Sequence, residues 1–533
     1  MAAMLSGAIQ HLLEGYRASA IPRPKHEADI LVHVDEIASK IAKFYEQIRK
    51  VVDYREEHLL RTSHIIRALR RHILLHRKDQ NIREIAESLV KDIIRAGHLP
   101  NDSIGEAEVD RVAQIITNLL FLFDKVPTAN AQEVLGMREW LIRIVASAVE
   151  ETLDPPHKDR LMAEAMFMSL KDRLVIKGRQ LSDNERFIQL YIAIERALLR
   201  VDEDQLSWRL SVFRYGEWLW GNELDLEAFA MRLGAMRSQI ARDAAHPLGS
   251  AFFALCNRYN TVFLLLGDAV FDKRNFLEDP QELFRDEGTL ETIIRQVYKK
   301  RFERQRQKMS RFAFFTIVSL FITKVLAALI IEIPIDVYLT HDFSFWHAAA
   351  NIVFPPILML MILVFIRMPT SANLGLVQEE VRAVVFEERR KEYLMVIPEK
   401  KSTVFQRVAR LGYWIVSLVV LWGLWQVLLS LGFSVASLVV FGLFTSIVAA
   451  TGLRAHNRSK EISLEAQKAS FKSFLADLLF MPLVSLGQMV IRGMSRFRFL
   501  VVAVNLIEVP FQTMVGFVEN FNAVVKSKKE ELY

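Results

Sequence analysis

Two ionisable residues, Lys324 and Glu332, interrupt an apolar run that extends over Phe312–Ile333. A charged side chain at mid-bilayer costs about 2.5–3.5 kcal/mol or more, so such residues often serve ion binding, proton transfer or transport. If Lys324 faces the interior of a helix bundle, its predicted partner is Glu508 or Asp477, each in a later apolar segment. Lys324, Glu332 and Glu508 therefore form the candidate intramembrane polar site.

A simpler interpretation of the Lys324–Glu332 pair follows from helix geometry. Counted from Phe312, Lys324 lies about 18 Å into a hydrocarbon core of roughly 30 Å, and its long side chain can reach the far surface. Glu332 lies about 12 Å further along and is rotated by roughly 80° in an ideal helix. The pair then consists of a snorkelling lysine and a hydrated interfacial glutamate.

Two groups of histidines give weak metal-binding signals. His72 and His76 are four residues apart, as helical zinc ligands are, but no carboxylate is placed to complete the site. His341, Asp342 and His347 cluster in a short polar stretch that suits a metal ion, a pH sensor or simply a hydrated loop. We predict no metal site.

The chain contains a group of aromatic residues and lacks the common catalytic motifs. We interpret the aromatic group as packing in a core or an interface, and a ligand-binding aromatic box is the alternative. The chain has no phosphate-binding glycine loop, G-x-G-x-x-G, G-x-S-x-G, H-E-x-x-H or C-x-x-C motif. We therefore predict no catalytic residues and no cofactor, and we expect the protein not to be an enzyme. The aromatic group comprises Trp208, Phe213, Tyr215, Trp218 and Trp220.

Four apolar runs are long enough to cross a bilayer, which takes about 20 helical residues. The short connection between the last two predicts a tight antiparallel hairpin, in which Gly442 and Ser446 would allow close helix approach. Trp346 and Trp414 lie near the ends of runs, as interfacial anchors do. The predicted spans are Phe312–Ile333, Ala348–Ile366, Leu411–Leu431 and Phe433–Leu453.

Lysine and arginine flank these runs asymmetrically. They are dense before the first run and between the second and third, and absent from the loop between the first and second. The positive-inside rule then places both termini in the cytoplasm and two short loops outside. This topology predicts a multi-pass integral membrane protein, and its compactness and charge bias favour a bacterial inner membrane over an organelle membrane.

The last part of the chain, residues 455–533, carries two more apolar stretches within residues 474–518. If both crossed the membrane, a loop containing Arg492, Arg496 and Arg498 would lie outside, against the charge rule. We therefore predict interfacial or re-entrant helices followed by a cytoplasmic tail. Six full spans are the alternative.

The front half, residues 1–310, has the apolar spacing of helices nearly throughout. Ser103 with Glu106 and Ser182 with Glu185 match the capping box that begins a helix. No alternating β-branched run supports a sheet. We predict a bundle of about eight to ten helices, with an internal boundary near Asp154 in the stretch LDPP.

Basic and acidic residues balance within residues 1–310, so the net charge of +6 arises from residues 311–533. The overall excess of cations is thus a membrane-flanking pattern. The acid-free basic stretch Arg61–Lys78 fits a solvated helix face, a contact with anionic lipid, or nucleic acid, of which nucleic acid is the least favoured. The only cysteine, Cys256, rules out an internal disulfide.

The sequence thus predicts an all-α protein in three parts: a cytoplasmic helical domain over 1–310, a four-span membrane domain over 311–454, and membrane-associated helices over 455–533. We expect a non-enzymatic, membrane-anchored interaction or scaffold module with protein partners on the cytoplasmic side, which contacts the lipid bilayer and can form homo-oligomers. A channel or transporter assembled from the transmembrane core is the alternative function.

Overall fold

The structure is a computed structural model of the chain. Short stretches and single residues are also described within 337–360 and 438–448. The main described ranges are residues 4–20, 31–34, 57–74, 81–125, 130–178, 181–220, 223–271, 280–335, 371–387, 391–396 and 403–430.

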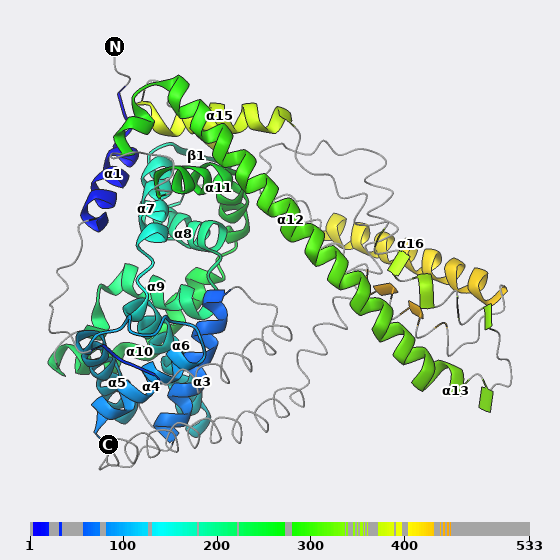
Figure 1. The fold of residues 1–533 in the computed structure, drawn as a ribbon, viewed down its shortest axis with the longest axis horizontal. Coiled ribbons are helices and arrows are strands. Elements are labelled where there is room, and N and C mark those ends of the chain that lie inside the picture. Colours follow the sequence, from blue (N-terminus) through cyan, green and yellow to red (C-terminus); the bar gives the residue numbers. More distant parts are fainter. Residues whose placement is uncertain are drawn as a thin grey trace, which may run out of the picture. The chain divides into compact units, whose positions relative to one another are not determined.

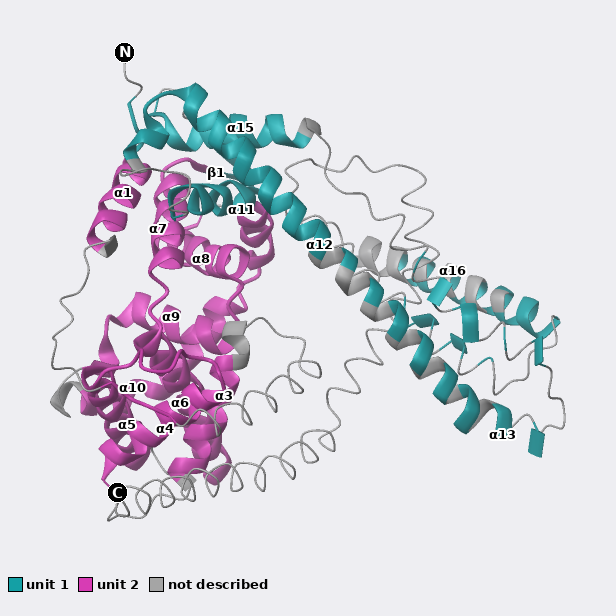
Figure 2. Cartoon of the chain, in the orientation of Figure 1, with its two compact units in different colours: residues 1–6, 175–180, 258–501 teal, residues 7–174, 181–257, 502–533 magenta. Residues whose placement is uncertain are grey.

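The chain divides into two compact units, coloured teal and magenta in Figure 2. Unit 1 comprises residues 1–6, 175–180 and 258–501, and unit 2 comprises residues 7–174, 181–257 and 502–533. Nearly all the described secondary structure in both units is helical, which confirms the predicted helical character of the fold.

Unit 2 is a bundle of amphipathic helices, most of which pack around one apolar core. Within it α3 packs on α4 and α6, α5 packs on α4 and α6, and α6 packs on α9, while α7 contacts α1 and α8. Ile93, Leu119 and Val145 are among the side chains with no exposed surface. The helices are α1 (Gly7–Ala20), α3 (Glu57–Leu74), α4 (Ile82–Arg95), α5 (Glu106–Lys125), α6 (Ala131–Leu153), α7 (His157–Lys171), α8 (Asp183–Ile194), η1 (Glu195–Leu199), α9 (Glu203–Tyr215), η2 (Trp218–Trp220) and α10 (Glu223–Ala244).

One of the two predicted capping boxes is confirmed and the other is wrong. Ser182 accepts from the backbone N–H of Glu185, and the Glu185 carboxylate accepts in return from the backbone N–H of Ser182. Ser103 instead donates to the carbonyl of Pro100, and the Glu108 carboxylate accepts from the N–H of Gly105. Helix α5 therefore begins two residues later than the Ser103 box requires.

The stretch LDPP is a turn between two helices of unit 2. Asp154 caps the C-terminus of α6, and Pro156 precedes α7 as its N-cap residue. Proline cannot supply the backbone donor that would continue α6, which explains the break. The predicted internal boundary near Asp154 thus falls inside a single compact unit.

Unit 1 contains the longest helix of the described chain, α12 (Glu287–Ala327), which Figure 1 shows as one continuous rod. It runs through residues 310 and 311, where we predicted a boundary between domains. Helix α11 contains the limit between the two units. The other elements are α11 (Gly249–Phe271), η3 (Pro280–Phe284), η4 (Ala328–Glu332), α13 (Ile333–Ile335), α15 (Ser371–Val385), α16 (Thr403–Ser430), β1 (Leu174–Lys177) and β2 (Tyr393–Val396).

Segments far apart in the sequence fold together in unit 1. Ser6 donates its backbone N–H to the carbonyl of Val385 at 2.8 Å and its hydroxyl to the carbonyl of Val384 at 2.7 Å. Helix α15 is tied to α12 by an ion pair of 2.7 Å between Arg382 and Glu291. The stretch between the second and third predicted spans thus packs with the N-terminus and with the residues before the first span.

The expectation of no β-sheet is wrong in one place, because β1 and β2 pair in a two-stranded sheet. Each strand has four residues and their partners are more than two hundred residues apart in the chain. Four residues are too few to show an alternation of apolar and polar side chains. Whether they form a strand depends on the partner strand, which only the folded chain brings close.

The predicted spans are covered unevenly by the described residues. Phe312–Ile333 lies in α12, η4 and the start of α13, and all but the last residue of Leu411–Leu431 lies in α16. Ala348–Ile366 and Phe433–Leu453 are described only in part, and residues 455–533 lie outside the described residues. In the part of the chain that the structure describes, none of the helices combines the length and apolarity needed to cross a membrane.

Helices α12 and α16 nevertheless expose rows of large apolar side chains. The α12 stripe consists of Phe314, Val318, Ile322 and Leu326, and the α16 stripe consists of Leu411, Ile415, Leu418 and Trp422. The members of each stripe recur every three or four residues, so they share one helix face. Both stripes are exposed apolar surface in the described structure.

The close helix approach predicted at Gly442 and Ser446 falls in a stretch that is described only in part. A Cβ built at Gly442 would meet no atom of the described residues within 4 Å. Ser446 is buried, and the rings of Phe354 and Phe441 lie 5.0 Å apart. One residue of the second predicted span and one of the fourth, Phe354 and Phe441, therefore contact each other.

Candidate functional site

A cavity of about 980 Å³ opens into unit 2. Its walls come from α1, α5, α6, α7, α8 and α9 together with the turn from Gly216 to Trp220. Cavities of roughly 300–1,000 Å³ are the size that binds small organic ligands. This cavity is the candidate functional site.

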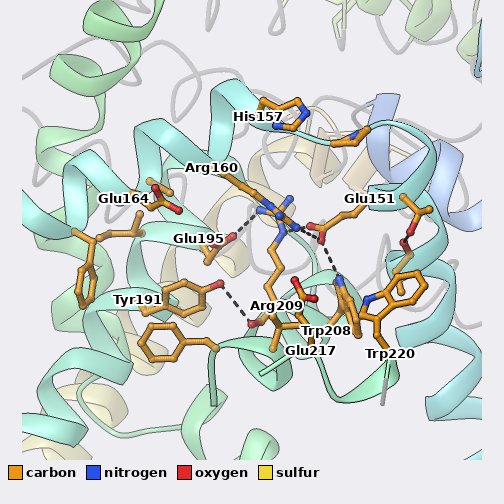
Figure 3. Close-up of a pocket in the computed structure, with 18 of the residues that line it drawn as sticks. Glu151, His157, Arg160, Glu164, Tyr191, Glu195, Trp208, Arg209, Glu217 and Trp220 are labelled. Atoms are coloured by element: carbon orange, nitrogen blue, oxygen red, sulfur yellow. Dashed lines mark hydrogen bonds and ion pairs between the residues drawn. The ribbon is translucent and has the colours of Figure 1, made fainter. Parts of the chain in front are cut away.

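Four charged side chains form a continuous ion chain along the cavity wall, from Arg160 through Glu151 and Arg209 to Glu195 (Figure 3). The Glu151 carboxylate accepts from Arg160 Nη2 and from Arg209 Nε, each at 2.7 Å. Arg209 Nη1 donates to Glu195 Oε2 at 2.7 Å, and Trp208 Nε1 donates to Glu151 at 2.9 Å. The inner part of this ion chain is nearly enclosed, and only Arg160 is largely exposed.

Burial and the attraction between opposite charges both shift the pKa values of residues in and beside this ion chain. Burial raises the pKa of Glu195 despite the opposing charge of Arg209. Burial alone would lower the pKa of Arg209, but the charges of Glu195 and Glu151 raise it above its usual value. The pKa of Tyr191 lies well above its usual value because of burial and the nearby Glu195 carboxylate. Ionised Glu195 is therefore tolerated mainly because Arg209 stays charged.

An irregular backbone presents Glu195 to the cavity. Helix α8 passes directly into the π-helical segment η1, whose first residue is Glu195. The segment ends at Arg200, which adopts a left-handed conformation with φ of 54°. Single π-turns occur often at functional sites, and a non-glycine residue at positive φ is uncommon. The strain is concentrated where the fold places a buried carboxylate on a cavity wall.

Aromatic side chains make much of the remaining wall. The rings of Tyr191 and Phe213 stack at 4.2 Å between centroids, and Trp208 and Trp220 lie near Glu151 (Figure 3). Trp208 and Trp218 are both buried, but Trp218 is not one of the described lining residues and donates to the hydroxyl of Ser211. Of the aromatic group that we assigned to packing, Trp208, Phe213 and Trp220 also line the cavity.

The rim carries charged groups with hydrogen-bonding capacity to spare. Among the described residues, Arg111, His157 and Glu217 of the rim form no ion pair, and Arg160 uses one of its N–H groups on Glu151. A guanidinium has five N–H donors, so most of those on Arg160 remain available. The first turn of α7, which contains His157 and Arg160, has no side-chain cap on its backbone donors.

Hydrogen bonds hold both carboxylates of the ion chain in fixed positions. Glu151 accepts three hydrogen bonds, and Glu195 accepts one from Arg209. Fixed charges and rigid aromatic walls provide a preorganised recognition surface.

The predicted intramembrane site is only partly described. Lys324 lies in α12, Glu332 is the last residue of η4, and Glu508 lies outside the described residues. Because η4 is π-helical, the rotation of roughly 80° expected between Lys324 and Glu332 in an ideal α-helix does not apply.

The histidine and basic candidates have other roles where they are described. His72 contacts Asp92 at 3.4 Å, and Arg71 pairs with the same carboxylate. Burial would raise the pKa of Asp92, but the hydrogen bond from His72 and the charge of Arg71 lower it. In the described ranges no three metal-ligating side chains come together. The remaining candidates, His76, His341, Asp342 and His347, lie outside the described residues.

Two arginines of the basic stretch Arg61–Lys78 pair with acids of the same unit. Arg61 pairs with Glu150 at 3.1 Å and with Asp154 at 2.6 Å, and Arg70 pairs with Glu139. Acids from α6 therefore neutralise arginines of α3 inside unit 2. The described part of this stretch is better explained by helix packing than by a surface for lipid or nucleic acid.

Sequence reasoning missed the ion chain of the cavity. Glu195 stands in the apolar stretch YIAIERALL, where a lone acid on a buried helix face is as unusual as Glu332 in its apolar run. That signal was available, but its partner Arg209 is identified only by the packing of α8 on α9. No family model, curated protein or solved structure matches the chain, so the case for its function rests on its own sequence and geometry.

Proposed function

We propose that the protein is a non-enzymatic, membrane-anchored interaction module, in which α-helical units on the side of both termini recognise a partner or ligand. The α12 and α16 stripes carry this proposal. Phe314 is 63% exposed and Leu418 is 61% exposed, which a protein surrounded by water rarely allows in continuous rows. Lipid acyl chains would cover such rows without any ordered partner.

Basic residues next to the α12 stripe support lipid as the molecule that covers it. Arg304 and Arg306 are exposed on α12, about two turns before the α12 stripe begins at Phe314. Arginine at this position can contact anionic headgroups while the apolar face enters the bilayer. Trp346 and Trp414 are both exposed, as interfacial anchors would be.

The assembly of unit 1 supports the proposed topology. Residues 4–6, the first half of α12 and α15 pack together, so they must lie on one side of any membrane. The chain must therefore cross the membrane an even number of times between the first half of α12 and α15. The two spans proposed in that stretch meet this condition. We place this side in the cytoplasm of a bacterial inner membrane, with four spans as the main proposal and six as the variant.

Membrane association of the full chain tests the proposal. We expect the expressed protein to float with membranes in a density gradient and to resist extraction with alkaline carbonate. Replacing Val318, Ile322, Leu418 and Trp422 by aspartate should reduce the membrane-bound fraction several-fold, because each buried carboxylate costs about 2.5–3.5 kcal/mol.

The matched control is Leu135→Asp, which alters an equally exposed apolar residue of unit 2. It should leave flotation unchanged. A wild-type chain that stays in the soluble fraction, or a stripe variant that floats as well as wild type, would contradict membrane anchoring.

A channel or transporter is the second candidate, favoured by the π-helical segment η4 between Lys324 and Pro334. π-Turns in apolar helices often accompany functional sites. Ion or solute flux from liposomes that contain the purified chain, lost in Lys324→Leu, would favour transport. Sealed liposomes together with a specific ligand would favour the interaction module.

A further inference from the structure

We propose that the cavity of unit 2 binds an organic anion, with a carboxylate or phosphate group held by Arg160 and Arg111 and an apolar or aromatic body held by the aromatic wall. The proposal names the ligand class of the interaction module. It requires only the geometry of unit 2, so it does not depend on whether the chain is anchored in a membrane.

The N–H donors that remain available in the cavity can hold an anion. Four glutamates and three arginines line it, which taken alone would favour a cation. Glu151 and Glu195 are already neutralised by Arg160 and Arg209 within the ion chain. Glu164 lies 3.8 Å from His11. Among the lining residues that the structure describes, the groups without an ion pair are one guanidinium, one imidazole and one carboxylate, namely Arg111, His157 and Glu217. Arg160 adds the N–H donors that its pair with Glu151 does not use.

Arg160 is held in position for a ligand. Its Nη2 is fixed on the Glu151 carboxylate, which Arg209 and Trp208 hold from the other side. A guanidinium fixed on one edge can offer its other donors to a second oxyanion in a forked geometry. The buried Arg209–Glu195 pair then acts as a support that prevents Glu151 from turning towards the ligand. Figure 3 shows the Arg160 side chain reaching inward to this ion chain beside His157.

The aromatic part of the cavity wall determines the body of the ligand. Tyr191 and Phe213 form a stacked pair, and Trp208 and Trp220 add two indole rings. Flat rings of this kind bury planar or aliphatic groups at little entropic cost. The cavity volume of about 980 Å³ accommodates an anion of drug-like size with both parts bound at once.

Four probes that share a naphthalene ring and differ in their polar group separate the contribution of charge to the binding free energy from that of apolar contact. The purified full chain in phosphatidylcholine nanodiscs is titrated calorimetrically with 1-naphthyl phosphate, 1-naphthoate, 1-naphthylmethylammonium and 1-naphthol. We expect the phosphate or the carboxylate to bind at least about tenfold more tightly than the ammonium and the alcohol, as a charge-assisted hydrogen bond allows.

Substitutions at the rim assign the anion to its residues. Arg160→Gln should weaken anion binding by about tenfold or more and leave 1-naphthol unchanged, and Arg160→Lys should be intermediate, because lysine keeps the charge without the fork. Arg111→Gln should weaken anion binding without disturbing the ion chain, which keeps the test independent of any effect on folding. The matched control is Arg83→Gln, an exposed arginine of α4 that is paired with Asp110 outside the cavity.

Three results would overturn the inference: equal or tighter binding of the ammonium probe, no binding of any of the four probes at millimolar concentration, or anion binding that both Arg160→Gln and Arg111→Gln leave unchanged. The source of the anion is separated by repeating the titration in nanodiscs that contain phosphatidylglycerol. Weaker probe binding there identifies a lipid headgroup as competitor, and unchanged binding identifies a free anion. Flotation reports on membrane anchoring separately from all these titrations.

Discussion

Glu195 is a carboxylate that the fold keeps almost out of water on a cavity wall. Its single strong support is Arg209, which it shares with Glu151. Replacing a buried ion pair by apolar groups often leaves stability unchanged, whereas removing one partner is costly. A buried ion pair on a cavity wall agrees with the proposed role in positioning Arg160.

The raised pKa of Glu195 predicts a pH dependence with a definite sign. A carboxyl that is protonated more readily when folded stabilises the fold at pH values below its unfolded pKa of about 4.5, and that contribution is lost as pH rises through the higher folded pKa. Glu195→Gln cannot ionise, so the stability of wild type relative to this variant should fall as pH increases from about 4.5.

Hydrogen exchange of the slowest amides in unit 2, measured at several pH values for both proteins, checks this. Glu203→Gln removes an exposed carboxylate of α9 and controls for the loss of one charge. A difference between wild type and Glu195→Gln that stays flat or increases with pH would contradict the raised pKa.

At the scale of single elements, the two predicted capping boxes show what local sequence can decide. Both match the same pattern, yet only Ser182 caps its helix, because the backbone around Ser103 turns to place Gly105 at the start of α5. The pattern specifies side-chain chemistry, but the path of the chain decides which residue occupies the cap.

Paired alanine substitutions test this difference. Ser182→Ala should destabilise unit 2 by about 1 kcal/mol, since it removes the acceptor for the backbone N–H of Glu185. Ser103→Ala removes a hydrogen bond to a loop carbonyl only and should cost less. Hydrogen exchange at the first turns of α8 and α5 measures both effects, and equal losses at the two serines would contradict the assignment.

At the scale of the whole molecule, unit 1 is built from pieces that the sequence presents as separate regions. Its N-terminal residues, α12 and α15 are joined by hydrogen bonds and by the Arg382–Glu291 pair. Tyr298 accepts from the amide of Asn373 at 2.9 Å inside the same unit. A stretch between two predicted spans is therefore part of a folded unit and not merely a linker.

Cysteine labelling tests the topology that follows. The only native cysteine, Cys256, is buried, and burial raises the pKa of its thiol, so its background reactivity should be low. In intact cells, an impermeant maleimide should label Tyr338→Cys in the proposed outer loop and should label Leu376→Cys on α15 only after lysis. Both positions are exposed, so access to water is matched. Labelling of Leu376→Cys in intact cells would overturn the orientation.

The sequence by itself determined the helical character of the chain, the cap of α8 and the apolar runs with their flanking cations. These features depend on neighbouring residues, where spacing and propensity act directly. Only the tertiary structure decided that Glu151, Glu195 and Arg209 meet on one cavity, that Trp208 lines it while Trp218 donates to the hydroxyl of Ser211, and that β1 finds β2. Each of these depends on contacts between residues that are distant in the chain, and the energy of such contacts is realised only when the helices pack.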